Sequence, residues 1–146
     1  MVNALQFRTA TEDDCTELAL MIDVAGRRLP SYLWSQEVGQ GQSYFEYGRE
    51  IIRTDANNNA YFKNWLVAES QSKFVGAFFG FSVEDPYPEI DLDAVPVWWR
   101  PCKELERVAS GCWLLQVIAI LPQYRGKGLA RQLLDKAGSV AKDSGT

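Results

Sequence analysis

Two glycines and two cations are crowded between two apolar runs near the end of the chain. In "AILPQYRGKGLARQLL" (Ala119–Leu134), Arg125, Gly126, Lys127 and Gly128 follow one apolar run and precede another that has helical spacing. The first N–H groups of a helix lack intrahelical partners and carry partial positive charge. Glycines let a ligand reach those amides, and the cations add full charge beside them. The stretch predicts a phosphate or pyrophosphate site; the alternative is a tight turn with solvated cations.

Other kinds of site are excluded by residues that the chain lacks. No Gly-Lys pair in this loop is followed by Ser or Thr, and the three-glycine spacing of a dinucleotide fingerprint is missing. The chain contains no histidine, which excludes Ser–His and Cys–His nucleophile pairs and histidine-ligated metals. Cys15, Cys102 and Cys112 have no metal-type spacing and are typical of reduced thiols. We therefore predict no metal site.

Composition indicates one globular domain over residues 1–146. The chain is 47% hydrophobic, which suffices for a core. A net charge of −4 argues against nucleic acid as a partner, because phosphate neutralisation needs a broad basic face. No apolar run approaches the ~20 residues that span a bilayer, and the N-terminus has no signal-peptide pattern. We predict a cytoplasmic protein with no membrane or nucleic-acid partner.

Periodicity predicts the elements that precede the loop. Alternation over Ala4–Ala10 predicts a strand, and the next apolar face predicts a helix that Thr11 caps, with Asp14 as a capping-box partner, and that Gly26 ends. "RRLPSYLWSQEVGQGQ" is predicted to be a loop. A second helix is predicted from Ser43 to Arg53.

The second half is predicted to hold the remaining strands. "NWLVAES" and "KFVGAFFGFSVE", joined by "QSK", predict a hairpin. Asp85–Gly111 is rich in proline and predicted to be irregular, with a short helix at Lys103–Val108. Cys112–Leu121 is continuously apolar, which favours a central strand buried on both faces. Apolar spacing from Gly128 to Lys142 predicts an amphipathic helix. The expected order is β-α-α-β-β-β-α.

The loop and its surroundings resemble a known family. Gln123–Gly128 fits the pattern Gln/Arg-x-x-Gly-x-Gly/Ala of the acetyl-CoA site in the GNAT N-acetyltransferase superfamily. "VIAILPQYRGKGLARQLL" is similar to that family's strand, proline, phosphate loop and helix, and the element order matches the family's N-terminal half. "AGRRLPSYLW", "IDLDAVP" and "RPCKELE" are similar to segments of bacterial members. The resemblance implies an α/β (α+β) acyl-CoA N-acyltransferase fold with a mixed central sheet flanked by helices.

The resemblance also implies a cofactor, acetyl-CoA, and the residues that hold it. Loop amides from Arg125 to Ala130 would hold the pyrophosphate. Ile118, Ala119 and Ile120 fall where the family's fourth strand carries a bulge and offers backbone groups to pantetheine. For Ile118 and Ile120, core packing is the alternative or additional role. The implied cofactor-binding residues are Ile118, Ala119, Ile120, Gln123, Arg125, Gly126, Lys127, Gly128, Leu129 and Ala130.

For catalysis, the resemblance implies direct attack by an amine on the thioester, with help from a proton acceptor and an oxyanion donor. The predicted fourth strand contains no acid. Gln116 is its only polar side chain, so it is the candidate for orienting a water or the acceptor. The alternative is that Gln116 only finds a hydrogen-bond partner.

Acidic and aromatic side chains suggest a cationic amine as acceptor. The acidic candidates lie in one loop (Glu84, Asp85, Glu89, Asp91 and Asp93), and the aromatic ones are Tyr32, Trp34, Trp98 and Trp99. We predict that Tyr32, Trp34, Glu84 and Asp91 contact the acceptor. The alternative is a solvated acidic loop with partly buried aromatic residues.

The family normally continues beyond this last helix with a fifth strand, a helix and two more strands. The resemblance therefore implies a domain that is C-terminally incomplete, with the open edge of the fourth strand covered by a second copy in a homodimer. Two functions remain open. One is acetyl transfer to a primary amine of a small molecule or peptide. The other is a non-catalytic, CoA-binding or oligomerising remnant.

Overall fold

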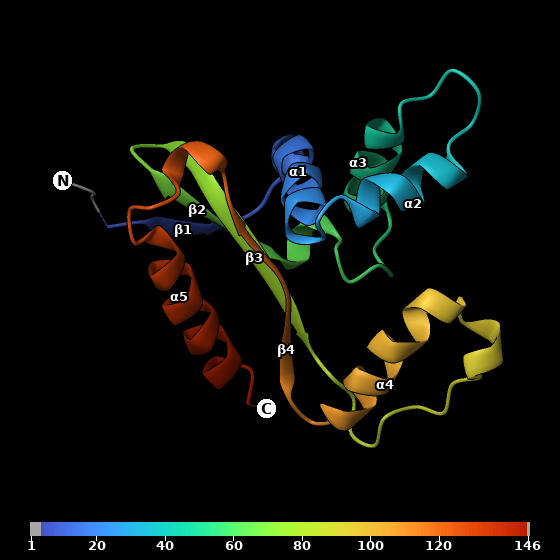
Figure 1. Cartoon of the computed structure of the whole chain (residues 1–146). Coiled ribbons are helices and arrows are strands. Elements are labelled where there is room, and N and C mark those ends of the chain that lie inside the picture. The colour runs from blue at the N-terminus through green and yellow to red at the C-terminus, as the bar shows by residue number, and fades with distance from the viewer. Residues whose placement is uncertain (1–3, 146) are drawn as a thin grey trace.

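In the computed structural model, which describes residues 4–145, a four-stranded sheet lies between helices on its two faces (Figure 1). The elements follow the order β1, α1, α2, α3, β2, β3, α4, β4, α5. The strands are β1 (Gln6–Thr9), β2 (Trp65–Ser70), β3 (Lys73–Ser82) and β4 (Trp113–Ile120). The helices are α1 (Cys15–Ala25), α2 (Leu29–Glu37), α3 (Tyr44–Thr54), α4 (Arg100–Val108) and α5 (Leu129–Asp143). The predicted α+β class is confirmed.

The strands lie in the order β1-β2-β3-β4, and each neighbouring pair is antiparallel. The expectation of a mixed sheet was therefore wrong for the described residues. The predicted hairpin is confirmed, because Gln71 and Ser72 adopt φ values of 50° and 63° and form a two-residue turn between β2 and β3. A long segment, residues 83–112, connects β3 to β4, and we call it the excursion. Strand β4 then pairs antiparallel with β3.

Each face of the sheet has its own apolar core. On one face, Leu18 of α1 packs with Val67 and Phe79, and α2 and α3 lie beyond α1. On the other face, Leu129 and Leu133 of α5 pack against the sheet. The predicted helices at Cys15–Ala25, Ser43–Arg53 and Gly128–Lys142 are confirmed within a residue or two. The Asp14 carboxylate accepts the Thr11 N–H at 2.7 Å, as the capping pattern predicts, although a short 3-10 helix precedes α1.

The segment predicted to be a loop after Gly26 contains helix α2. Pro30 is compatible with this helix because it lies in the first turn, where its missing N–H has no helical partner to lose. Trp34 packs its indole over Gly48 of α3 and meets Phe45 edge-on at 6.1 Å between ring centroids. Packing between α2 and α3 thus stabilises a helix whose sequence is only weakly amphipathic.

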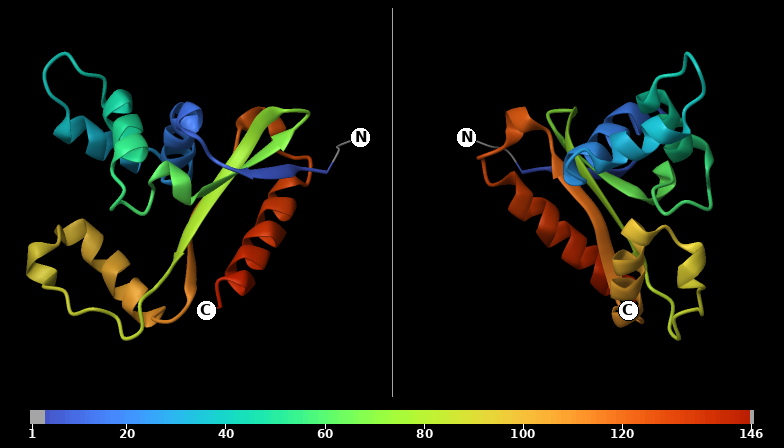
Figure 2. Two further views of the ribbon diagram at one scale, coloured as in Figure 1. Left: turned by 180° about the vertical axis from the view of Figure 1, so that it is seen from behind. Right: turned by 45° about the vertical axis from the view of Figure 1, so that its right-hand side comes forward.

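The excursion between β3 and β4 is also more helical than predicted. Helix α4 begins at Arg100, three residues before the predicted start, because Pro101 lies in its first turn. The excursion lies on the same side of the sheet as α1, α2 and α3, away from α5 (Figure 2).

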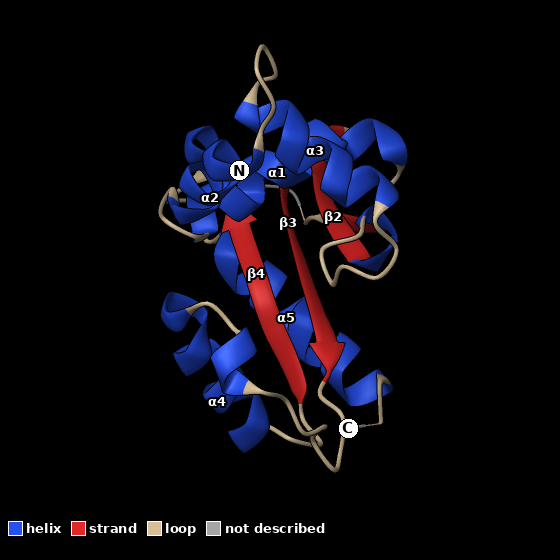
Figure 3. Ribbon diagram, turned by 90° about the vertical axis from the view of Figure 1, so that its right-hand side faces the viewer, coloured by secondary structure: helices blue, strands red, loops and turns tan. Residues whose placement is uncertain are grey.

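Strand β4 was expected to be a central strand buried on both faces, and that expectation was wrong. Within the described chain it pairs only with β3 and forms the edge of the sheet. Only Ala119 and Ile120 are buried; the other residues of β4 are partly or fully exposed. Figure 3 views the molecule onto β4, with α1 to α3 at one end, α4 beside the other end and α5 behind. The apolar residues of β4 border the core and also two cavities, one along the open edge of the strand and one on the α1 side of the sheet.

Candidate functional site

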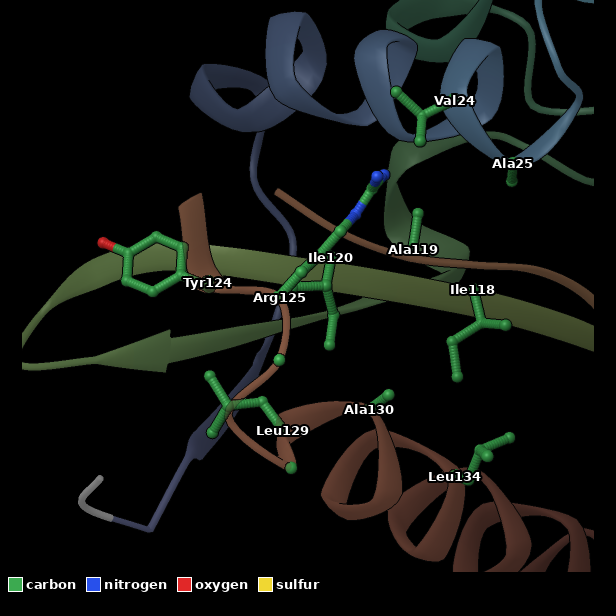
Figure 4. Close-up of a pocket in the computed structure, with 12 residues that line it drawn as sticks. Val24, Ala25, Ile118, Ala119, Ile120, Tyr124, Arg125, Leu129, Ala130 and Leu134 are labelled. Carbon is green, nitrogen blue, oxygen red and sulfur yellow. The ribbon is translucent and has the colours of Figure 1, made fainter. Parts of the chain in front are cut away.

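A cavity of about 440 Å³ follows the open edge of β4, and we call it the edge cavity. Its upper wall in Figure 4 is the end of α1, its lower wall is the start of α5, and the loop before α5 closes one end. The lining residues are Val24, Ala25, Ile118, Ala119, Ile120, Tyr124, Arg125, Gly126, Gly128, Leu129, Ala130 and Leu134.

The main-chain N–H and C=O groups of Ile118 and Ile120 point away from β3, toward the edge cavity. The Leu121 N–H donates to the Val75 carbonyl at 2.8 Å, so residue 121 faces β3. Because the direction of main-chain groups alternates along an antiparallel strand, Ala119 also faces β3, while Ile118 and Ile120 face outward. The side chains alternate across the faces as well, Ala119 toward α1 and Ile118 toward α5 (Figure 4). The edge can therefore pair with an extended ligand as with another strand.

The loop before α5 leaves backbone amides open. Gly126 and Gly128 both adopt φ of +78°, a region that favours glycine, and a Cβ at either would meet nothing within 4 Å. Among the described residues, the N–H groups of Gly126, Lys127 and Gly128 have no hydrogen-bond acceptor. The first turn of the 15-residue helix α5 contains no acidic residue. The loop thus offers unpaired donors at a positive helix end, which suits a phosphate group.

Two cations accompany these amides. The Arg125 side chain extends from the loop toward the α1 side of the edge cavity (Figure 4). The Lys127 ammonium lies 5.8 Å from the centroid of the Tyr124 ring. Both side chains are exposed and neither forms an ion pair with a described carboxylate. Their charges remain available to an anion.

A second cavity of about 640 Å³ adjoins β4 on the α1 side of the sheet, and we call it the aromatic cavity. One wall comes from α1, α2 and α3, the opposite wall comes from residues 96–106, and the floor is Phe79 with residues 114–117 of β4. Trp34 lies in the first wall and Trp98 and Trp99 lie in the second, with their ring centroids 5.6 Å apart. The cavity is apolar and bounded by segments distant in the sequence.

Glu106 is the single charged side chain among the described residues that line the aromatic cavity. Its side chain is 14% exposed. Oε2 accepts the Tyr87 hydroxyl at 2.8 Å and the Lys103 ammonium at 3.2 Å, whereas Oε1 has only Lys103 at 3.5 Å. Burial, and next the hydrogen bond to Glu106, raise the pKa of Tyr87 to about 12, so the phenol remains a donor.

The two cavities meet at one point on β4. Ala25 lines both, and the lining of β4 passes from the aromatic cavity at Val117 to the edge cavity at Ile118. The register pairs Val117 with Phe79 and Leu115 with Gly80, which leaves Gln116 as the extra residue of a bulge. The bulge predicted at Ile118–Ile120 therefore lies at Gln116. The exposed Gln116 side chain lines the aromatic cavity at this junction and forms no hydrogen bond with the described residues.

The structure places most of the predicted cofactor-binding residues around the edge cavity. All of them line the edge cavity except Gln123 and Lys127, whose side chains lie outside its lining. Of the four residues predicted to contact the acceptor, only Trp34 lines the aromatic cavity, together with the other aromatic candidates Trp98 and Trp99.

The other three predicted acceptor residues lie elsewhere. Tyr32 is 61% exposed, two residues from Trp34 and hence on another side of α2. Glu84 is at the base of the excursion, where its carbonyl accepts the Ser110 hydroxyl at 2.8 Å. Asp91 accepts the Asp93 N–H at 3.0 Å and caps a short 3-10 helix.

Sequence reasoning missed Glu106. A signal was present in "RPCKELE": Cys102, Leu105 and Glu106 have the spacing that places side chains on one face of a helix. The spacing alone does not show which part of the protein this face of α4 lies against.

Within residues 4–145, no group of three or more Cys, Asp or Glu side chains could hold a metal ion. None of the helices described there is long and apolar enough to cross a bilayer.

The chain is similar to acetyltransferases in sequence and in structure. The family model "Acetyltransferase (GNAT) family" matches residues 29–146. A crystal structure described as an acetyltransferase matches at TM-score 0.63 and 17% identity, over 97% of this chain and 76% of that one. An N-acetyltransferase from Staphylococcus aureus Mu50 matches at TM-score 0.51 and 17% identity, over 90% and 74%. These likenesses show the fold. No curated protein sequence matches the chain.

Proposed function

Because the chain belongs to the acetyltransferase (GNAT) family, we propose that it transfers an acetyl group from acetyl-CoA to a primary amine held in the aromatic cavity. One observation carries the proposal: the edge cavity and the aromatic cavity meet at Ala25 and at the Val117–Ile118 step of β4. A donor along the edge and an acceptor in the aromatic cavity would have their reacting ends at that junction.

The edge cavity suits CoA in its chemistry. Outward main-chain groups of Ile118 and Ile120 would pair with the amide groups of pantetheine, as one strand pairs with another. The unpaired amides of Gly126 to Gly128 and the first turn of α5 would hold the pyrophosphate, with Arg125 adding charge. The side chains of β4 along the edge cavity are apolar, but this does not weaken the proposed binding of CoA, because pantetheine would pair with main-chain groups.

Acetyl-CoA supplies the acyl group as a thioester: the amine nitrogen bonds to the carbonyl carbon, the C–S bond breaks, and the products are an amide and the CoA thiol. The chain's own residues would position the amine between the aromatic walls, and the proton that the amine loses would pass to water at the junction while the departing thiolate takes one up. Gln116, the extra residue of the bulge, is placed to orient that water or the amine. We propose Gln116 as a positioning residue.

Calorimetric titration with CoA, followed by a thiol-release assay on acetyl-CoA with a panel of primary amines, tests the function. Binding of CoA together with amine-dependent thiol release is expected. Binding without release for any amine would favour a non-catalytic CoA-binding module. No binding of CoA would contradict the assignment of the edge cavity.

We also propose a homodimer, as the sequence analysis predicted. The outward groups of Ile118 and Ile120 are needed for CoA, so an interface on β4 would use its Trp113–Leu115 end, which is partly exposed. Sedimentation analysis should find a dimer whose proportion does not fall when CoA is added. A monomer at micromolar concentration would contradict the dimer. Dissociation by CoA would show that the interface uses the edge cavity instead.

A further inference from the structure

The aromatic cavity narrows the choice of acceptor. We propose, on the basis of the proposed function, that the acceptor is a primary amine that carries an aromatic or other bulky apolar group and no carboxylate. Three features of the cavity carry this inference: its apolar walls, its volume, and its one carboxylate.

The walls suit an aromatic group. Trp34 comes from α2, and Trp98 and Trp99 come from the excursion between β3 and β4, so aromatic rings lie on two opposite walls. Phe79, which is 2% exposed, lies on the floor. The volume of about 640 Å³ is within the usual range for small-ligand sites, about 300–1,000 Å³. An apolar group that displaces water from these rings is favoured, whereas a polar chain would lose its hydration without gaining partners.

The carboxylate sets the charge of the ligand. Glu106 lies on the face of α4 that lines the cavity, and its side chain is 14% exposed. Oε2 already accepts hydrogen bonds from the Tyr87 hydroxyl and the Lys103 ammonium. Oε1 has one contact, with Lys103 at 3.5 Å, and can accept another donor. The Lys103 ammonium, 3.2 Å from Oε2, already balances the charge of Glu106, so the open Oε1 favours an amine N–H donor over a second carboxylate. The lining offers no other charged side chain, so the second ammonium of a diamine and the carboxylate of a free amino acid would each be buried without a partner of opposite charge.

The experiment compares three amines of different chemistry in the thiol-release assay: 2-phenylethylamine, phenylalanine and 1,4-diaminobutane. We expect kcat/KM for 2-phenylethylamine to exceed that for the diamine about tenfold and that for phenylalanine about 100-fold. A value for 2-phenylethylamine equal to or below either of the others would overturn the inference while leaving the acetyltransferase function in place.

Matched variants on α4 test the role of Glu106. Glu106→Gln keeps the size of the side chain and its acceptor for Tyr87, and it should raise KM for 2-phenylethylamine about tenfold and narrow the discrimination against phenylalanine. Glu104→Gln removes the same charge from an exposed position on the same helix, outside the cavity, and should behave as the wild type. Equal KM values in the two variants would overturn the role of Glu106.

A binding measurement separates the inference from the proposed function. Calorimetry with 2-phenylethylamine alone, in the absence of CoA, requires no turnover. Binding that Glu106→Gln weakens and Glu104→Gln does not would support the inference even if no thiol were released. If CoA binds and supports transfer to other amines but 2-phenylethylamine does not bind, the inference fails and the function stands.

Discussion

Along β4, Ile118 and Ile120 present main-chain groups to the edge cavity, whereas residues 114–117 line the aromatic cavity. The edge cavity is built almost entirely from one contiguous stretch, residues 118–134, with Val24 and Ala25 added. The aromatic cavity takes its walls from α1, α2, α3 and the excursion that contains α4. The lining of β4 changes from one cavity to the other at the step from Val117 to Ile118, next to the bulge residue Gln116.

This difference has a consequence for mutation. A site made of main-chain groups tolerates side-chain change unless the new side chain blocks access or alters the backbone. A site made of side chains depends on the packing of each wall. Substitutions can therefore impair one cavity and spare the other.

Gly128→Glu should produce the largest effect, on the edge cavity alone. The new side chain adds bulk and negative charge where the amides are open, and affinity for CoA should fall by more than about 100-fold in calorimetry. The positive φ of +78° adds a loss of about 1 kcal/mol in unfolding free energy, too small to unfold the protein. Gly138→Glu makes the same change farther along α5, where a Cβ meets nothing within 4 Å, and should leave affinity intact. Equal affinities in the two variants would contradict the site.

Gly48→Ala should affect the other cavity alone. A Cβ at Gly48 would lie 2.5 Å from the Trp34 indole, so the ring must move out of its place in the wall. We expect KM for the amine to rise about tenfold and the unfolding free energy to fall by ~1–3 kcal/mol, with affinity for CoA unchanged. Gly39→Ala, at a position with nothing within 4 Å, is the control. A parallel loss of CoA affinity would show that the two cavities are not independent.

The same contrast explains what could be predicted from the sequence. The loop from Arg125 to Gly128 and helix α5 were predicted well, because a strand, two glycines and an amphipathic run carry their signals within one short stretch. Helix α2 was missed because its stability comes from the contact of Trp34 with Gly48, a tertiary contact that spacing within α2 does not reveal.

The acidic residue of the aromatic cavity was missed for a related reason. Acidic residues were expected to contact the acceptor, but neither Glu84 nor Asp91 lines the aromatic cavity; Asp91 caps a short 3-10 helix, and Glu106 is the acidic residue in the lining. Which face of α4 meets which wall depends on the path of the whole excursion between β3 and β4. The open edge of β4 was expected from the resemblance, but the partial exposure of its residues was not, since an apolar strand beside two cavities has the same composition as one buried in a core.

Arg125→Ala should have a smaller effect on the edge cavity than Gly128→Glu. The side chain is exposed, so its attraction for a phosphate is screened by salt. We expect CoA affinity to fall about fivefold at low salt, with a shallower dependence of affinity on salt concentration than in the wild type. Arg107→Ala removes the same charge from an exposed position outside both cavities and should change neither quantity. If Arg125→Ala lowers only stability, the arginine is structural.

The smallest effect concerns Tyr87, beside Glu106. Burial, and then the hydrogen bond to Glu106, raise the pKa of Tyr87 from 10.0 to about 12 in the folded protein. Between these two pH values the unfolded chain has already lost the phenol proton that the folded chain retains. Unfolding therefore releases a proton in this window, and the stability that the raised pKa confers is lost as pH rises from 10 to 12.

Tyr87→Phe has no phenol proton, so it should not show the loss of unfolding free energy that the titration of Tyr87 causes between pH 10 and 12. The difference in unfolding free energy between wild type and variant, measured by urea denaturation at several pH values, should be constant below pH 10 and shrink from pH 10 to 12. Taking the difference removes the titration of the lysines, which both proteins share. Since Tyr87 donates to Glu106 and does not line the edge cavity, CoA affinity at neutral pH should be the same in both proteins. A constant difference up to pH 12 would mean that Tyr87 titrates alike in the folded and unfolded chains, and that its hydroxyl does not hold Glu106 in place.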